Sequence, residues 1–140
     1  MTKDNIPTEI VGYKYISKAD HRDNTPTKSQ WTVSVADEHA CFDFGVGHGW
    51  VSTSGDSAWG LHVIDGKADY LGKSAPGRGP EASLFVAFFQ LADVCHGYPS
   101  DLKRSRREIP PTSVTRAWLE GKYLKGPVIR KLQLGQTCSL

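Results

Sequence analysis

Basic side chains crowd the last third of the chain, and the chemistry that they offer is the binding of anions. Four of them stand together in the segment 103–107, and the others follow at intervals up to position 131. Guanidinium and ammonium groups neutralise phosphates and carboxylates, so we expect this set to contact nucleic acid or an acidic protein surface. The candidate binding residues are Lys103, Arg104, Arg106, Arg107, Arg116, Lys122, Lys125, Arg130 and Lys131.

The charge of the chain is divided unevenly. Residues 1–97 hold 8 basic against 12 acidic residues, whereas residues 98–140, the basic C-terminal region, hold 9 against 3. Clustered cations raise the local concentration of anions and speed their association. Tyr98, Trp118 and Tyr123 lie among the cations. Such rings either stack on unpaired bases or, as the helical spacing indicates for Trp118, belong to the core.

A second chemistry, acid–base or nucleophilic catalysis, rests on three residues of the N-terminal part. Alternating strand positions place Asp43 and His62 on the polar face of a sheet, where the carboxylate would orient the imidazole as a general base. Ser57, or alternatively Ser52 or Ser54, would be the nucleophile beside them. No G-x-S-x-G elbow occurs, so the sequence assigns no catalytic site and favours a protein that is not an enzyme. A small hydrolase or ligand-binding protein that uses this face is the alternative.

Metal and cofactor motifs are not predicted. Gly45-Val46-Gly47-His48-Gly49 lacks the spacing of a dinucleotide fingerprint. Gly77-Arg78-Gly79-Pro80 lacks the lysine of a P-loop, although it precedes a predicted helix whose amides would suit an anion. The available zinc ligands show neither C-x-x-C nor H-E-x-x-H spacing, and they are His39, Cys41, His48, His62, Cys95 and His96.

The composition is typical of a globular protein. Hydrophobic residues make up 39% and charged residues 23% of the 140 residues, which is outside the range of disorder and fits a single domain over 1–140. The longest apolar run, 84–89, is far shorter than the ~20 residues that cross a bilayer. The polar N-terminus carries no signal peptide, so we expect a cytoplasmic protein without a membrane partner. Three cysteines leave at least one unpaired thiol.

An antiparallel β-meander over 30–72 should position the candidate catalytic residues. Apolar residues alternate around positions 31–35, 42–46 and 59–63, with turn residues between these segments. Asp65-Gly66 predicts a type I′ turn that pairs residues 62–64 with 67–69. A further strand is expected within 10–16, where the residues favour β structure.

Two helices and a final strand are expected after the meander. Apolar residues from Leu84 to Cys95 recur at helical spacing and predict a main helix over 81–96 that covers the sheet. Thr112 or Ser113 is the expected N-cap of a second, shorter helix that ends at Gly121. Alternation over 128–134 predicts a C-terminal strand, whose edge would pair with a second copy in a homodimer.

These elements predict an α+β fold in which a β-meander packs against one main helix, with a second short helix and a C-terminal strand. The predicted function is that of a small non-enzymatic binding or regulatory module whose basic C-terminal region contacts nucleic acid or an acidic protein surface. A structural or oligomerising interaction protein is the remaining alternative.

Overall fold

The computed structural model describes residues 6–136 and 138–140 and has a mixed α+β fold, which confirms the predicted class. One three-stranded sheet has the order β10-β9-β4, and its strands are β4 (Ser57–Gly60), β9 (Ala87–Gln90) and β10 (His96–Pro99). A second has the order β3-β7-β8, with β3 (Gln30–Trp31), β7 (Gly72–Lys73) and β8 (Ser83–Leu84). Two hairpins join β1 (Thr8–Ile10) to β2 (Tyr13–Tyr15) and β5 (His62–Ile64) to β6 (Lys67–Asp69). The named strands pair antiparallel throughout.

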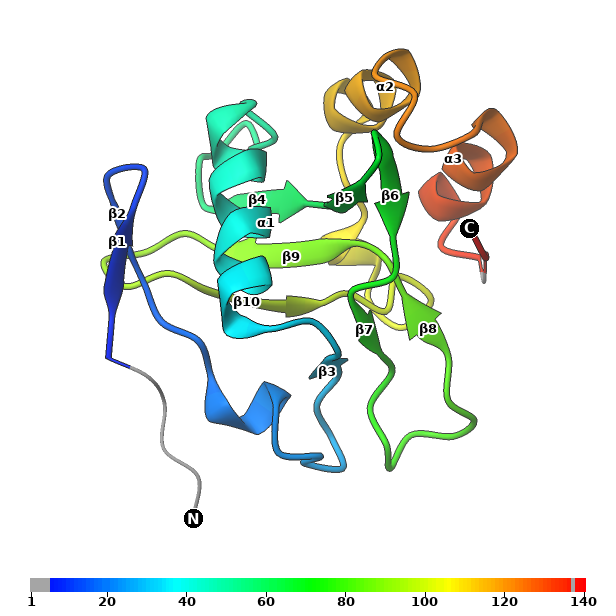
Figure 1. Cartoon of the computed structure of the whole chain (residues 1–140). Coiled ribbons are helices and arrows are strands. Elements are labelled where there is room, and N and C mark those ends of the chain that lie inside the picture. The colour runs from blue at the N-terminus through cyan, green and yellow to red at the C-terminus, as the bar shows by residue number, and fades with distance from the viewer. Residues whose placement is uncertain (1–5, 137) are drawn as a thin grey trace.

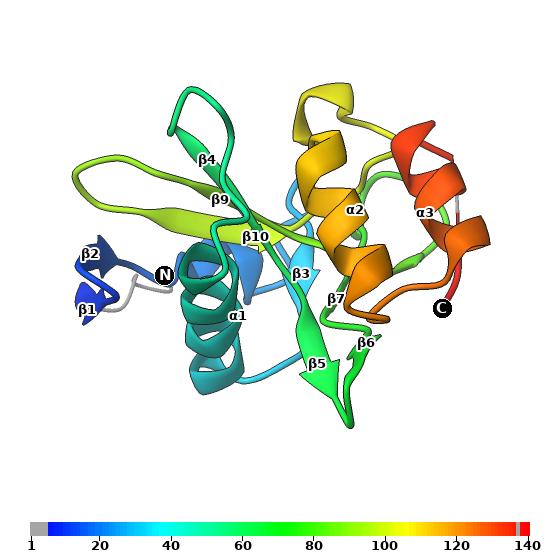
Figure 2. The same cartoon turned by 90° about the horizontal axis from the view of Figure 1, so that it is seen from above.

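Helices cover both faces of the β10-β9-β4 sheet (Figures 1 and 2). Helix α1 (Val35–Gly47) lies on one face and α2 (Thr112–Glu120) on the other, and α3 (Gly126–Gln133) packs beside α2. Strand β9 therefore sends alternate side chains into two cores. Phe89 meets Phe42 of α1, with 5.2 Å between ring centroids, whereas Phe88 meets Trp59 on the opposite side at 5.8 Å. Both faces of the central strand are buried.

Residues 35–47 form α1, so the β-meander predicted over 30–72 is wrong in its middle part. The hydroxyl of Ser34 accepts a hydrogen bond from the Asp37 amide at 3.1 Å and caps the helix. The buried positions follow helical spacing, and they are Glu38, Cys41, Phe42 and Gly45. Because two of these buried residues are an acidic residue and a glycine, the helical pattern cannot be recognised from the apolar residues alone.

Residues 81–96 do not form a helix, which corrects the prediction of a main helix there. They supply β8, β9 and the beginning of β10, and residues 84–89 are all buried. A strand covered on both faces reads as a continuous apolar run, and periodicity alone does not separate such a run from a buried helix. An anion site at helical amides after Gly77–Pro80 is therefore not formed, because the next element is the strand β8.

Of the two elements predicted for the end of the chain, the short helix is confirmed and the C-terminal strand is wrong. The second helix forms as α2 and its C-cap is Gly121, although Pro111 stands at the N-cap in place of Thr112 or Ser113. Residues 128–134 are not a strand, because they lie in α3 and at its C-cap. Ile129 and Leu132 of α3 are buried at i, i+3 spacing, with Pro127 in the first turn. The edge strand that suggested a homodimer is therefore absent from the described residues.

The β5–β6 hairpin is confirmed in its predicted register, with His62 opposite Asp69. Asp65 and Gly66 at its turn have φ angles of 52° and 80°. A β-branched residue resists a positive φ, so we expect Gly66→Val to lower the free energy of unfolding by about 1–2 kcal/mol. Urea denaturation measures this loss. Gly66→Asn is the control, since asparagine tolerates the left-handed region, and equal stability of the two variants would contradict the turn.

Within the part of the chain that the structure describes, the helices are too short and too polar to span a bilayer.

Candidate anion-binding site

All nine predicted cations have exposed side chains. They are spread over the loop and the short 3₁₀ helix η2 (Arg106–Glu108) that precede α2, over α2 and α3, and over the link between these helices. Lysine and arginine are usually solvated, so exposure alone says little. What matters is how many of these charges are neutralised within the protein.

The acidic residues of the basic C-terminal region neutralise few of them. Asp101 forms an ion pair with Arg104, with 3.6 Å between the carboxylate Oδ2 and the guanidinium Nε. Glu108 is buried and accepts hydrogen bonds from the Tyr98 hydroxyl at 2.7 Å and the Ser100 hydroxyl at 2.6 Å. Arg104 is the one member of the nine that forms an ion pair with a described residue. The other eight side chains are exposed and form no ion pair with a described residue.

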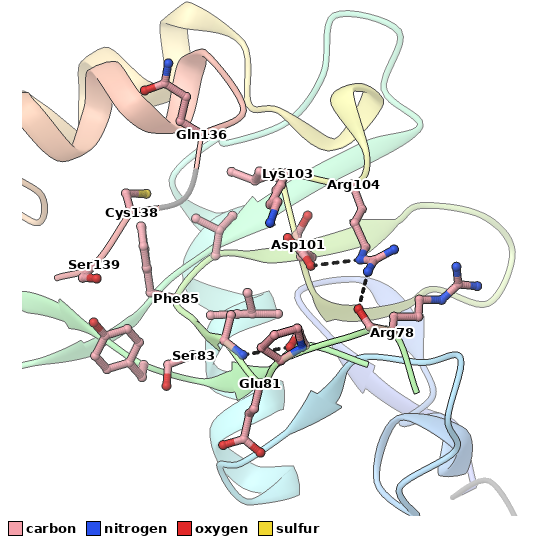
Figure 3. Close-up of a pocket in the computed structure, with 18 residues that line it drawn as sticks. Arg78, Glu81, Ser83, Phe85, Asp101, Lys103, Arg104, Gln136, Cys138 and Ser139 are labelled. Atoms are coloured by element: carbon pink, nitrogen blue, oxygen red, sulfur yellow. Dashed lines mark hydrogen bonds and ion pairs between the residues drawn. The ribbon is translucent and has the colours of Figure 1, made fainter. Parts of the chain in front are cut away.

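A cavity of about 560 Å³, which we call the Lys103 cavity, opens beside the first of these cations. Lys103 and Arg104 contribute basic side chains to it. Leu84, Phe85 and Leu102 contribute apolar ones. Figure 3 shows the ammonium group of Lys103 extending into the cavity and the carboxylate of Glu81 turned away from it. The cavity thus combines an apolar floor with a positive wall.

Arg104 is held in place at the edge of the Lys103 cavity. Besides the ion pair with Asp101, its Nη2 donates a hydrogen bond to the backbone carbonyl of Arg78 (Figure 3). The guanidinium group therefore joins the 101–107 loop to the 74–80 loop. The Arg78 guanidinium extends beyond Arg104, away from the Lys103 cavity (Figure 3).

The three aromatic residues of the region are already occupied by protein contacts. Trp118 is fully buried in the core between the sheet and α2. Tyr123 packs edge-on against Trp50, with 5.8 Å between ring centroids. Tyr98 stacks on His21 at 4.9 Å, with the two rings nearly parallel. The rings therefore support the fold, and base stacking is not part of the site.

The candidate catalytic residues are not brought together. Asp43 is exposed on α1, whereas His62 lies on β5, so the shared sheet face predicted by strand parity is not formed. No hydrogen bond or ion pair joins the two among the described residues. Ser57, on β4, donates to the neighbouring Asp56 carboxylate at 3.3 Å. The prediction for Asp43 is wrong because residues 42–46, expected to form a strand, lie in helix α1.

Within residues 6–136 and 138–140, no three histidine, cysteine or acidic side chains gather as metal ligands would. The three cysteines are free thiols. Burial raises the pKa of Cys41 to about 12, so its thiol stays protonated at neutral pH and is not a nucleophile.

A polar group surrounds Tyr98 that no pattern in the sequence predicts. Its hydroxyl bonds to Glu108, and its ring faces His21, whose Nδ1 donates to the Ser29 carbonyl at 2.8 Å. Burial lowers the pKa of His21, so the ring is neutral at neutral pH. Residues 21, 98 and 108 lie in three different elements of secondary structure, and no local motif connects them.

Comparison with protein-family models, with curated proteins and with solved structures gives no match to this chain.

Proposed function

We propose that this protein is a non-enzymatic module that binds the phosphate backbone of nucleic acid through its basic C-terminal region. The observation that carries the proposal is the set of nine exposed cations, of which Arg104 is the one that forms an ion pair with a described residue. Each phosphate that such a cation neutralises releases counterions, and this release favours binding. The buried and hydrogen-bonded Glu108 keeps one acidic charge away from that surface.

The lack of an apolar anchor favours nucleic acid over an acidic protein as the partner. Protein interfaces are organised around a buried apolar core with large anchoring side chains. The large exposed apolar residues described in this region are Leu119, Leu134 and Leu140, which lie in α2, at the end of α3 and at the C-terminus. They are scattered singly among charges. Backbone contacts need no such anchor, and with Trp118 buried we expect little preference for base sequence.

The test measures binding of labelled single- and double-stranded oligonucleotides between about 50 and 200 mM salt. The variant Lys103→Gln/Arg106→Gln/Arg107→Gln leaves the Arg104 contacts intact, so it should fold normally. We expect its affinity to fall at least tenfold at the lower salt concentration. The slope of log affinity against log salt should fall by about three units, one for each lost phosphate contact.

The matched control is Lys14→Gln/Lys67→Gln/Lys73→Gln, which removes the same charge from the N-terminal part of the chain. It should keep the wild-type salt slope. If both triple variants lose affinity equally, binding reflects net charge and the basic C-terminal region is not the site. If wild-type protein binds neither oligonucleotide at low salt, the proposed function is wrong.

A further inference from the structure

A second cavity, of about 520 Å³, lies around the polar group at Tyr98, and we call it the Tyr98 cavity. Four separate parts of the chain line it: the 3₁₀ helix η1 (Ala19–His21), the 27–29 loop, the loop at 75–78 and the segment 98–108. It shares Arg78, Asp101 and Arg104 with the Lys103 cavity. The contact between Arg104 and the Arg78 carbonyl thus stands where the two cavities meet.

The Tyr98 cavity carries a surplus of positive charge. Lys28, Arg78 and Arg104 bring three cations to its lining from three parts of the chain. Lys28 and Arg78 form no ion pair with any described residue. Of the two acidic residues, Asp101 pairs with Arg104, and Glu108 already accepts bonds from two hydroxyl groups. Two cations without an ion pair to a described residue therefore lie in the lining of the same cavity.

Unused hydrogen-bond donors stand beside these charges. Thr27 and Ser105 are among the residues that line the Tyr98 cavity, and their hydroxyl groups form no hydrogen bond with a described residue. The neutral His21 and the bonded Tyr98 form a wall that adds no negative charge. Cations and hydroxyl donors that converge from several sides suit a compact anion with several acceptor oxygens, whereas a flat surface suits an extended chain.

We propose that the Tyr98 cavity binds a phosphate monoester, with the unpaired Lys28 and Arg78 neutralising its charge and the Thr27 and Ser105 hydroxyls donating to its oxygens. A monoester carries about −1.5 to −2 charges and three strong acceptor oxygens, which these groups match. A phosphodiester carries a single charge and is less well matched. The site requires no nucleic acid, so it stands independently of the function proposed for the basic C-terminal region.

The test is calorimetric titration of the full chain with inorganic phosphate, with sodium chloride adjusted to hold the ionic strength constant. Wild-type protein should show saturable binding. Lys28→Gln and Arg78→Gln should each weaken it about tenfold, because each removes one charge-assisted bond. Both side chains are exposed and form no hydrogen bond or ion pair with a described residue, so these variants should fold. Lys67→Gln, on the β5–β6 hairpin, is the matched control and should bind phosphate within twofold of wild type.

A second arm distinguishes a free phosphate from one at a strand end. A 5′-phosphorylated oligonucleotide should bind more tightly than its 5′-hydroxyl counterpart if the cavity receives strand ends, and Lys28→Gln should abolish that difference. Equal binding of the two oligonucleotides assigns the cavity to small phosphate esters. The proposal is overturned if inorganic phosphate shows no saturable binding, or if Lys28→Gln and Arg78→Gln bind it as the Lys67→Gln control does.

Discussion

Gly45→Ala should destabilise the protein by about 3 kcal/mol or more, because α1 and β4 touch through their backbones at this glycine. A Cβ atom at position 45 would lie 2.1 Å from the carbonyl oxygen of Trp59. Gly60 of β4 lies equally close to α1, because a Cβ atom at position 60 would lie 2.5 Å from the carbonyl oxygen of Cys41. Neither carbonyl can rotate away as a flexible side chain would, so the helix must shift off the sheet.

The matched control is Gly47→Ala, two residues further along α1. A Cβ there meets nothing nearer than the Asp43 carboxylate at 4.0 Å. Alanine has the higher helix propensity, so this variant should be neutral or more stable by up to about 1 kcal/mol. Urea denaturation of both variants measures the difference. Equal stability would show that α1 does not approach β4 as closely as the structure has it.

Local signals predicted the elements whose structure depends on local chemistry. The β5–β6 hairpin follows from Asp65-Gly66, whose positive φ angles few other residue pairs accept. Helix α2 follows from the prolines before it and from Gly121, which ends it. In both places the decisive interactions lie within a few residues, so the sequence pattern contained them.

Tertiary burial misled the prediction where it overrode local patterns. Residues 84–89 are all buried, and β9 lies in the sheet that has helices on both faces; the prediction took this continuous apolar run for one face of a helix. In α1 the reverse occurs, since the buried side includes Glu38 and Gly45. Glu38 is buried because it pairs with Arg22, and Gly45 is buried because it lies against β4. Neither tertiary contact can be predicted from a sequence pattern.

The candidate site shows the same division. The nine cations could be predicted to be exposed because desolvating a charge is costly, and each of them is exposed. The Tyr98 cavity could not be predicted, because Lys28, Arg78 and Arg104 meet only after three loops fold together. A charge count therefore locates a basic region, whereas the convergence of charges on one cavity is a property of the fold.

Glu38→Ala should lower the free energy of unfolding by about 3–5 kcal/mol, because it leaves a half-buried arginine without its counterion. The Glu38 carboxylate is fully buried and lies 2.7 Å from Nη2 of Arg22. It also accepts hydrogen bonds from the hydroxyls of Tyr15 at 2.5 Å and Ser17 at 2.7 Å. Removing it strands three donors in the core at once. Asp37→Ala, in the same helical turn, is the control and should cost no more than about 1 kcal/mol.

The same substitution should reach the proposed phosphate site. Arg22 follows η1 directly. Its guanidinium group pairs with Glu38 and donates a hydrogen bond from Nη1 to the Val33 carbonyl at 2.8 Å, so it connects η1 to α1 and to the segment before it. η1 carries His21, which forms part of the wall of the Tyr98 cavity. At a temperature where Glu38→Ala remains folded, we expect weaker binding of inorganic phosphate and an unchanged salt slope for oligonucleotide binding. If phosphate affinity stays at the Asp37→Ala level, the Glu38 network supports α1 alone and does not position the Tyr98 cavity.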